Sequence, residues 1–232
     1  MPDASPALPG AVLFDFDGTL ADSYPAITAS VNFIRSRYGL APLTVAEVKP
    51  FVGHGPENLL EHTVPGCNPP ADGQAYRAHH PEVMYELTSL FPGVSGALSK
   101  LAALRVRLGI CSNKPRRFTV ALLEHFGVAP LFSVILGPED VAAAKPAPDM
   151  LIAAGERLGL DRDRLLYVGD MRVDLQTARA AGVRVWLVPT GSDSRADLIA
   201  SGPDRLIDRI ADIPDLLTGS DLARPVSSES SQ

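Results

Sequence analysis

VLFDFDGTLADS, residues 12–23, joins an apolar run to two aspartates and a Gly-Thr pair. The run Val12–Phe14 is short and wholly apolar, which predicts a strand that is buried on both faces. Asp15 and Asp17 follow at the exit of this strand, where carboxylates are costly unless a positive charge meets them. Because hard divalent cations prefer oxygen ligands, the stretch predicts a Mg²⁺ site.

The composition is that of a folded protein. The chain has 232 residues, 46% of them hydrophobic, which allows one large domain or a core with a smaller domain. The net charge of −6 and the lack of a basic run indicate no nucleic-acid partner. Two cysteines are too few for a secreted disulfide framework, and residues 1–10 do not resemble a signal peptide. No apolar run reaches the length of a membrane span, so we expect a cytoplasmic protein without a membrane partner.

In the second part of the chain, short apolar runs alternate with segments of helical periodicity. Further strands are expected at residues 106–111, 134–136, 165–168, 183–188 and 206–207. Helices are expected between and after them, at residues 94–104, 116–126, 147–158, 172–181 and 210–217. This alternation predicts an α/β fold with a Rossmann-like parallel sheet and helices on both faces.

The segment that follows the first aspartates shows helical spacing and no strand pattern. Its expected helices are residues 25–38, 45–49, 56–64 and 74–87. We therefore expect an all-helical cap, residues 23–89, inserted into an α/β core of residues 10–22 and 90–218. The Pro- and Ala-rich residues 1–9 and the Ser-rich residues 219–232 are expected to be flexible tails.

Polar side chains follow the carboxyl ends of the later strands as well. They are Ser112 with Asn113, then Lys145, and finally Asp170 with Asp174. Each cluster alone has a structural explanation: a helix N-cap, a solvated lysine, and an acidic first turn of a helix. Ligands bind outside the carboxyl ends of the strands in open parallel sheets, so the coincidence favours one shared site.

With these clusters in this order, the chain resembles the haloacid dehalogenase superfamily, and within it the phosphatases with a helical cap. The matching motifs are DFDGTLADS at residues 15–23, SNKP at 112–115, KPAPD at 145–149, and Gly169-Asp170 with Asp174. The resemblance implies Mg²⁺-dependent hydrolysis of a small phosphate ester through an aspartyl-phosphate.

The resemblance also implies a role for each catalytic residue. Asp15 would be the nucleophile, since a carboxylate is ionised at neutral pH. Asp17 would act as general acid and then as general base. Ser112 and Lys145 would bind the phosphoryl group, whose negative charge needs positive partners.

The metal would be held by Asp15, by the backbone carbonyl of Asp17, and by Asp170. Asp174 would contribute either directly or through water. Main-chain N–H groups near Asn113 would help to bind the substrate.

A Gly-rich loop in the expected cap resembles one in phosphoglycolate phosphatases. Gly53, His54 and Gly55 precede a helix start, where backbone N–H groups can hold an anion. They are candidate substrate-binding residues, and an ordinary loop with a helix cap is the alternative.

Two further expectations concern isolated polar residues. Lys114 is expected to be solvated, and so are His62, His79 and His80.

The resemblance favours 2-phosphoglycolate as the substrate. A sugar phosphomutase would keep all four motifs, and a sugar phosphate, a nucleotide or pyrophosphate would suit the same chemistry. A non-catalytic binding or regulatory protein is a further alternative. A dehalogenase is disfavoured because it would not need Asp17. Nothing in the sequence indicates the oligomeric state.

Overall fold

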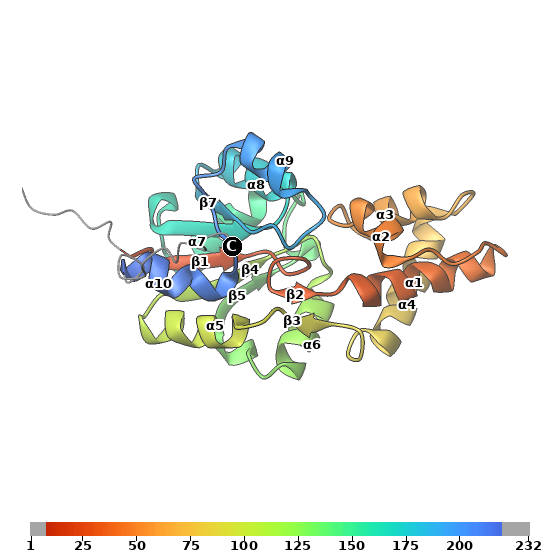
Figure 1. Ribbon diagram of the computed structural model, residues 1–232, viewed down its shortest axis with the longest axis horizontal. Coiled ribbons are helices and arrows are strands. Elements are labelled where there is room, and N and C mark those ends of the chain that lie inside the picture. The colour runs from red at the N-terminus through yellow and green to blue at the C-terminus, as the bar shows by residue number, and fades with distance from the viewer. Residues whose placement is uncertain (1–7, 220–232) are drawn as a thin grey trace, which may run out of the picture.

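A six-stranded parallel sheet forms the centre of the molecule (Figure 1). The computed structural model describes residues 8–219, so most of both expected tails lies outside the described residues. The strands are β1 (Ala11–Phe14), β4 (Arg107–Cys111), β5 (Phe132–Leu136), β6 (Leu165–Gly169), β7 (Arg184–Leu187) and β8 (Arg205–Leu206). Their order across the sheet is β5-β4-β1-β6-β7-β8.

Helices cover both faces of this sheet, which confirms the predicted α/β class. On one face the apolar cluster includes residues of α5 (Val94–Ala103), α6 (Arg116–His125) and α10 (Ile213–Thr218). On the other face a second apolar cluster includes residues of α7 (Asp149–Leu158), α8 (Arg172–Ala181) and α9 (Arg195–Ser201). Each face of the sheet is therefore buried, as the apolar strands require.

The two strands that flank β1 in the sheet, β4 and β6, are not the strands that come next to it in the sequence. Strand β1 pairs in parallel with β4 and with β6, and Phe14 lies opposite Ile110 and Val168. The chain order reverses at this strand, so its carboxyl end is the point where an open sheet forms a ligand crevice. Asp15 is the residue that follows Phe14 at this crevice.

Four helices, α1 to α4, form a separate group on one side of the sheet domain (Figure 1). They are α1 (Tyr24–Arg37), α2 (Val45–Val48), α3 (Pro56–Thr63) and α4 (Pro69–Val83). Buried side chains such as Val31, Ile34 and Leu60 join them in an apolar cluster of their own. Within residues 8–219, no helix has the length and apolarity that crossing a membrane requires.

The structure differs from the sequence-based expectation at four elements, β2, β3, α9 and α4. Residues Ala21–Asp22 (β2) and Ser89–Leu90 (β3) form a small antiparallel ladder at the two connections between core and cap, where no strand was expected. Helix α9 was also not expected. Helix α4 begins five residues earlier than predicted, because Asn68 caps its first turn and Pro69 suits its first position.

Candidate active site

Asp15 and Lys145 form a buried ion pair at the end of β1. The Lys145 Nζ lies 2.9 Å from Oδ2 of Asp15 and 2.6 Å from Oδ1 of Asp174. The three side chains are almost wholly inaccessible to solvent. A buried ammonium stabilises carboxylates strongly because no water screens it. The structure thus brings together Asp15, Lys145 and Asp174, as the sequence predicted for a common site.

Two residues hold Lys145 in this position. The side-chain amide of Asn113 accepts a hydrogen bond from the Lys145 backbone N–H at 3.0 Å and donates to its carbonyl at 3.0 Å. The hydroxyl of Tyr167 lies 3.1 Å from Nζ. Because the Asn113 amide also donates to the carbonyl of Gly53, both N–H donors of its side chain are used. The predicted contact of Asn113 with substrate would therefore involve its main chain.

Asp170 has the geometry expected of a metal ligand. Thr19 donates a hydrogen bond of 2.5 Å to Oδ1. Oδ2 is buried, and no residue in the described part of the chain hydrogen bonds to it. A buried carboxylate oxygen without a partner is costly, so this oxygen is suited to ligate a cation. The glycines beside this oxygen leave room for it, since a Cβ would lie 2.5 Å away at Gly18 and 1.6 Å away at Gly191.

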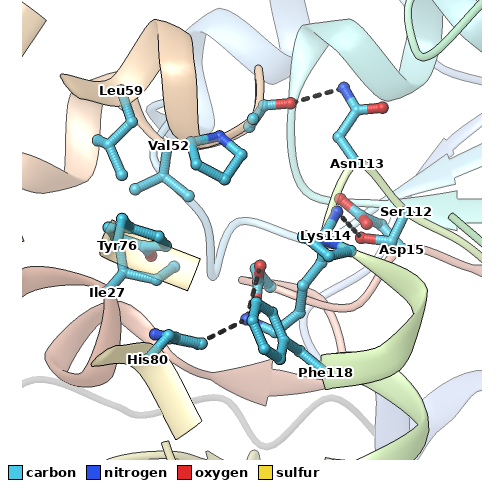
Figure 2. Close-up of a pocket in the computed structure, with 15 residues that line it drawn as sticks. Asp15, Ile27, Val52, Leu59, Tyr76, His80, Ser112, Asn113, Lys114 and Phe118 are labelled. Carbon is cyan, nitrogen blue, oxygen red and sulfur yellow. Dashed lines mark hydrogen bonds and ion pairs between the residues drawn. The ribbon is translucent and has the colours of Figure 1, made fainter. Parts of the chain in front are cut away.

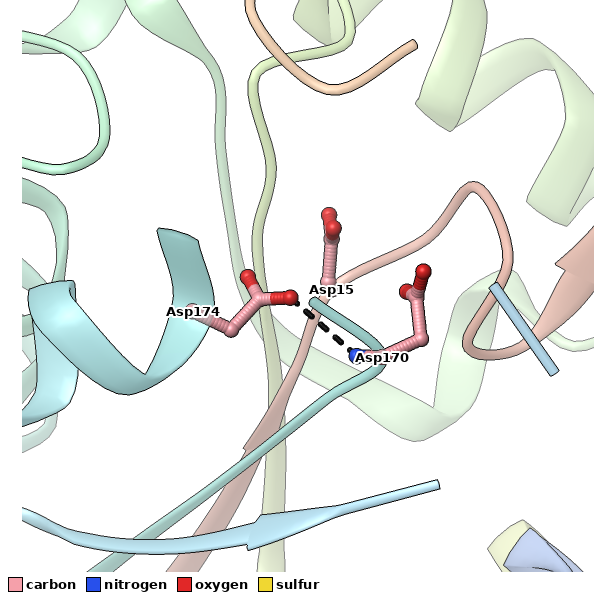
Figure 3. A group of neighbouring side chains, drawn as sticks. All are labelled: Asp15, Asp170 and Asp174. Carbon is pink, nitrogen blue, oxygen red and sulfur yellow. Dashed lines mark hydrogen bonds between the residues drawn. The ribbon is translucent and has the colours of Figure 1, made fainter. Parts of the chain in front are cut away.

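Three buried carboxylates could hold a divalent cation. One oxygen each of Asp15, Asp170 and Asp174 lies within 4.8 Å of the others. Figure 3 shows Asp15 and Asp170 side by side, with Asp174 approaching from α8. Carboxylate oxygens in such a group are the ligands that hard cations prefer. The residues present therefore fit a divalent metal.

The oxygens of Asp174 are already engaged. Oδ1 accepts from Lys145 and from Tyr167, and Oδ2 accepts from the backbone N–H groups of Asp170 and Met171 at 3.1 and 3.0 Å. These bonds cap the start of α8 and fix the loop that carries Asp170. This arrangement favours the alternative in which Asp174 acts through water or through Asp170.

Two carboxylates of this group, Asp15 and Asp170, have raised pKa values. Burial raises the pKa of Asp15 to about 6, even though Lys145 acts in the opposite direction. Burial, together with Asp174 and Asp15, raises the pKa of Asp170 well above its ordinary value. A bound cation would oppose both shifts because it would stabilise the ionised forms.

The Asp17 carboxylate, two residues after Asp15, contacts Ser23 and Lys114. Ser23 donates to its Oδ1, and the Lys114 Nζ lies 3.0 Å from Oδ1 and 3.3 Å from Oδ2. The expectation that Lys114 is solvated was therefore wrong: its exposed fraction is 6%. Its own ion pair with Asp17 compensates for burial of the charge.

The histidines of the expected cap differ in burial. His62 is exposed, as expected, but His79 is half-buried and His80 is 1% exposed. His80 lies 3.4 Å from the Lys114 Nζ through Nε2 and 3.0 Å from Oγ of Ser30 through Nδ1. Burial and the neighbouring Lys114 lower the pKa of His80 to about 2, so its ring is neutral at physiological pH.

A small pocket lies above Asp15, between the core and the cap (Figure 2). Residues of the cap, including Ile27, Val52 and Leu59, form its apolar side, and Ser112 and Lys114 belong to the core side. The volume open to water inside the pocket is about 50 Å³. Since one water needs about 10–15 Å³ by this measure, only a small ligand fits the present cap position.

The predicted cap loop divides between two cavities. Gly53 and Gly55 line the pocket above Asp15, whereas His54 lines a neighbouring cavity that also borders Asn113.

Four residues of the site were not predicted from the sequence: Tyr167, Thr19, Gly191 and His80. A Tyr within an apolar strand and a Gly in a loop carry no local signal of a site, whereas Thr19 stands inside the DGT motif and could have been included.

The comparisons with known proteins agree with this geometry. Residues 12–188 match the sequence profile of the haloacid dehalogenase-like hydrolases. A phosphoglycolate phosphatase of Cereibacter sphaeroides is 39% identical over 191 residues, which cover 79% of this chain and 86% of that protein. The phosphoglycolate phosphatase of Escherichia coli K12 is 34% identical over 195 residues, which cover 74% and 77%.

The fold comparison gives the same result. The crystal structure of a haloacid dehalogenase-like hydrolase from Bacteroides fragilis superimposes with a TM-score of 0.82 at 31% identity. The match covers 88% of this chain and 99% of that one. The sequence profile, the relatives and the fold all lead to one conclusion: this chain belongs to the haloacid dehalogenase-like hydrolase family.

Proposed function

We propose that the protein is a Mg²⁺-dependent phosphatase that hydrolyses 2-phosphoglycolate through an aspartyl-phosphate on Asp15. The observation that carries this proposal is Asp15 itself, which lines the small pocket while Lys145 and the metal-binding carboxylates surround it. The relatives named above support the choice of substrate, and the small pocket volume agrees with a two-carbon leaving group.

In the first half of the reaction, a carboxylate oxygen of Asp15 forms a bond to phosphorus and the bond to the leaving oxygen breaks. Asp17 gives its proton to that oxygen, so glycolate leaves as the alcohol. Lys145 and Ser112 offset the negative charge that Asp15 and the phosphoryl group bring together. Mg²⁺, held by Asp15, Asp170 and the carbonyl of Asp17, would supply further positive charge for the phosphoryl oxygens.

In the second half, Asp17 takes a proton from water, and the water oxygen attacks the phosphorus of the aspartyl-phosphate. The bond between phosphorus and the Asp15 oxygen breaks, and inorganic phosphate leaves. The cap over Asp15 limits the access of bulk water to this intermediate. Gly53, His54 and Gly55 remain candidate substrate contacts, the glycines from within the pocket and His54 from the adjoining cavity.

The test is phosphate release from a panel that contains 2-phosphoglycolate, sugar phosphates, nucleotides and pyrophosphate. We expect the highest kcat/KM for 2-phosphoglycolate, full loss of activity with EDTA, and full loss in Asp15→Asn. Asp163→Asn, at an exposed position far along the chain, is the matched control and should keep the wild-type rate. Turnover that needs a bisphosphate activator and releases little phosphate would instead establish a phosphomutase. No turnover of any panel member would contradict the proposal.

A further inference from the structure

Lys114 is a buried cation that faces the substrate pocket rather than the metal-binding carboxylates. Among the described residues that line this pocket, Lys114 is the one with a positive charge. Lys145, which pairs with Asp15, does not line it. We propose that Lys114 binds the carboxylate of the leaving group and that the cap residue His80 positions it. This inference rests on the proposed hydrolysis of 2-phosphoglycolate.

The position of Lys114 relative to Asp17 supports this role. To protonate the leaving oxygen, Asp17 must come within about 2.6–3.2 Å of it. The Lys114 Nζ is itself 3.0 Å from an oxygen of Asp17. The carboxyl carbon of glycolate is only two bonds from the leaving oxygen, so it falls within reach of Nζ. An ammonium has three donors and can hold Asp17 and a carboxylate at once.

The pocket walls explain why a cation is needed there. Ile27, Val52, Leu59 and Phe118 line the pocket with apolar surface. A carboxylate that enters such surroundings loses its water and binds only if a positive group replaces it. Lys114 provides that group, and a neutral leaving group of the same size gains nothing from it.

His80 holds Lys114 from the cap side. Its ring is fixed by the Ser30 hydroxyl at 3.0 Å and by the rings of Tyr76 and Phe118, whose centroids lie 5.4 and 5.1 Å away. With Nδ1–H donated to Ser30, Nε2 is free to accept a proton of the Lys114 ammonium at 3.4 Å. Because His80 belongs to α4 and Lys114 to the core, this contact forms only while the cap is closed.

The first experiment compares two substrates that differ in leaving-group charge, 2-phosphoglycolate and 2-hydroxyethyl phosphate. Lys114→Met keeps the length of the side chain and removes the charge. We expect the ratio of kcat/KM for the first substrate to that for the second to fall about 10- to 100-fold, the loss expected for a bond to a charged group. Lys114→Gln is a second variant in case Lys114→Met does not fold, and Lys100→Met, at an exposed lysine, is the control.

The outcomes separate this inference from the proposed function. A fall of the same size for both substrates would overturn the role of Lys114 in carboxylate binding, because the loss would then concern Asp17 alone. If the wild-type protein hydrolyses other esters but not 2-phosphoglycolate, the proposed substrate is wrong.

The second experiment tests His80. His80→Phe keeps a ring between Tyr76 and Phe118 but removes the acceptor, so KM for 2-phosphoglycolate should rise about 3- to 10-fold with a smaller change in kcat. His80→Gln, which retains an acceptor, should restore most of the affinity. Equal KM values in the wild type and in His80→Phe would contradict the positioning role.

Discussion

At the scale of single residues, the site is defined by charges that are buried before any ligand binds. Asp170 Oδ2 is buried without a hydrogen-bond partner among residues 8–219. The buried Asp15 carboxylate has the Lys145 ammonium as its ion-pair partner. Such groups reduce stability unless a cation meets them. The arrangement therefore suits a divalent cation, and without one these buried charges lower the stability of the fold.

Asp170→Asn tests this directly. In the metal-free protein the pKa of Asp170 is raised above its unfolded value, so between those two values the folded state binds more protons than the unfolded state. Stability therefore decreases as pH rises through that range. At pH 8 without metal, we expect Asp170→Asn to have a higher Tm than the wild type, and a flatter dependence of Tm on pH.

Addition of Mg²⁺ should raise the Tm of the wild type and leave that of Asp170→Asn unchanged, because ligand binding to the folded state stabilises it. Thermal unfolding with and without EDTA measures both effects. A lower Tm of the metal-free variant, or an equal response to Mg²⁺, would show that Asp170 is not the ligand.

Gly191 is required because of its contact with Asp170. A Cβ at this position would lie 1.6 Å from Asp170 Oδ2, so Gly191→Ala must displace the carboxylate. A displacement of about 1 Å in an active site costs on the order of 100-fold in rate, which is the expected loss of kcat/KM. Gly96→Ala is the control, since its Cβ meets nothing within 4 Å and it lies within a helix. Unchanged kinetics in Gly191→Ala would contradict the geometry around Asp170.

Single residues differ in how far sequence predicts them. Asp15, Lys145 and Asp170 were predictable because each belongs to a motif at a strand end. Lys114 and His80 were not, because an isolated lysine or histidine is solvated by default and only the approach of the cap buries these two. Tyr167 lies within an apolar strand, so the sequence pattern predicts only a core residue. Its hydroxyl nevertheless contacts Lys145 and Asp174.

At the scale of elements, the start of α8 connects the loop that carries Asp170 to Lys145. Asp174 on this helix accepts from two backbone N–H groups and pairs with Lys145. Asp174→Asn keeps the shape but leaves Lys145 with Asp15 as its remaining carboxylate partner. Breaking a buried ion pair costs about 3–5 kcal/mol, so we expect a loss of roughly 3 kcal/mol in the free energy of unfolding.

Urea denaturation of the metal-free protein measures this loss. Asp163→Asn is again the matched control and should change the free energy of unfolding by less than about 0.5 kcal/mol. An unfolding free energy in Asp174→Asn equal to that of the wild type would show that the ion pair adds nothing to the fold.

Long periodic elements were predicted well and short ones were not. Helix α8 was predicted with its observed bounds, Arg172–Ala181, because an acidic first turn and Gly182 mark its ends. Strands β2 and β3 have two residues each, too few to show alternation, and they exist because the core and cap connections lie side by side. Helix α9 has seven residues, of which only Leu198 is buried, so its apolar pattern is weak.

At the scale of the whole molecule, contacts between core and cap hold the pocket closed. The Asn113 amide donates to the carbonyl of Gly53 at 2.8 Å, and the Lys49 Nζ donates to the carbonyl of Thr190 at 3.3 Å. The alternation of strands and helices predicted a core with an inserted helical segment. It could not predict these contacts, because they join loops that lie far apart in the sequence.

Lys49→Met should therefore weaken the contact between cap and core without affecting the carboxylates of Asp15, Asp170 and Asp174. Loss of one hydrogen bond from a charged donor to a carbonyl is expected to lower kcat/KM for 2-phosphoglycolate about 2- to 10-fold. Steady-state kinetics measure the change, with Lys100→Met as the control lysine. If kcat/KM in Lys49→Met equals that of the wild type, the contact with Thr190 does not contribute to closure.

The most direct test of the whole account is to locate the phosphoryl group during turnover. The protein is mixed with Mg²⁺ and 2-phosphoglycolate, quenched in acid within the first turnovers, digested, and mapped by mass spectrometry. We predict a phosphoryl group on Asp15, in the peptide that carries it, and on no other residue. Rapid turnover with no phosphorylated peptide, or with the phosphoryl group on a different residue, would contradict it.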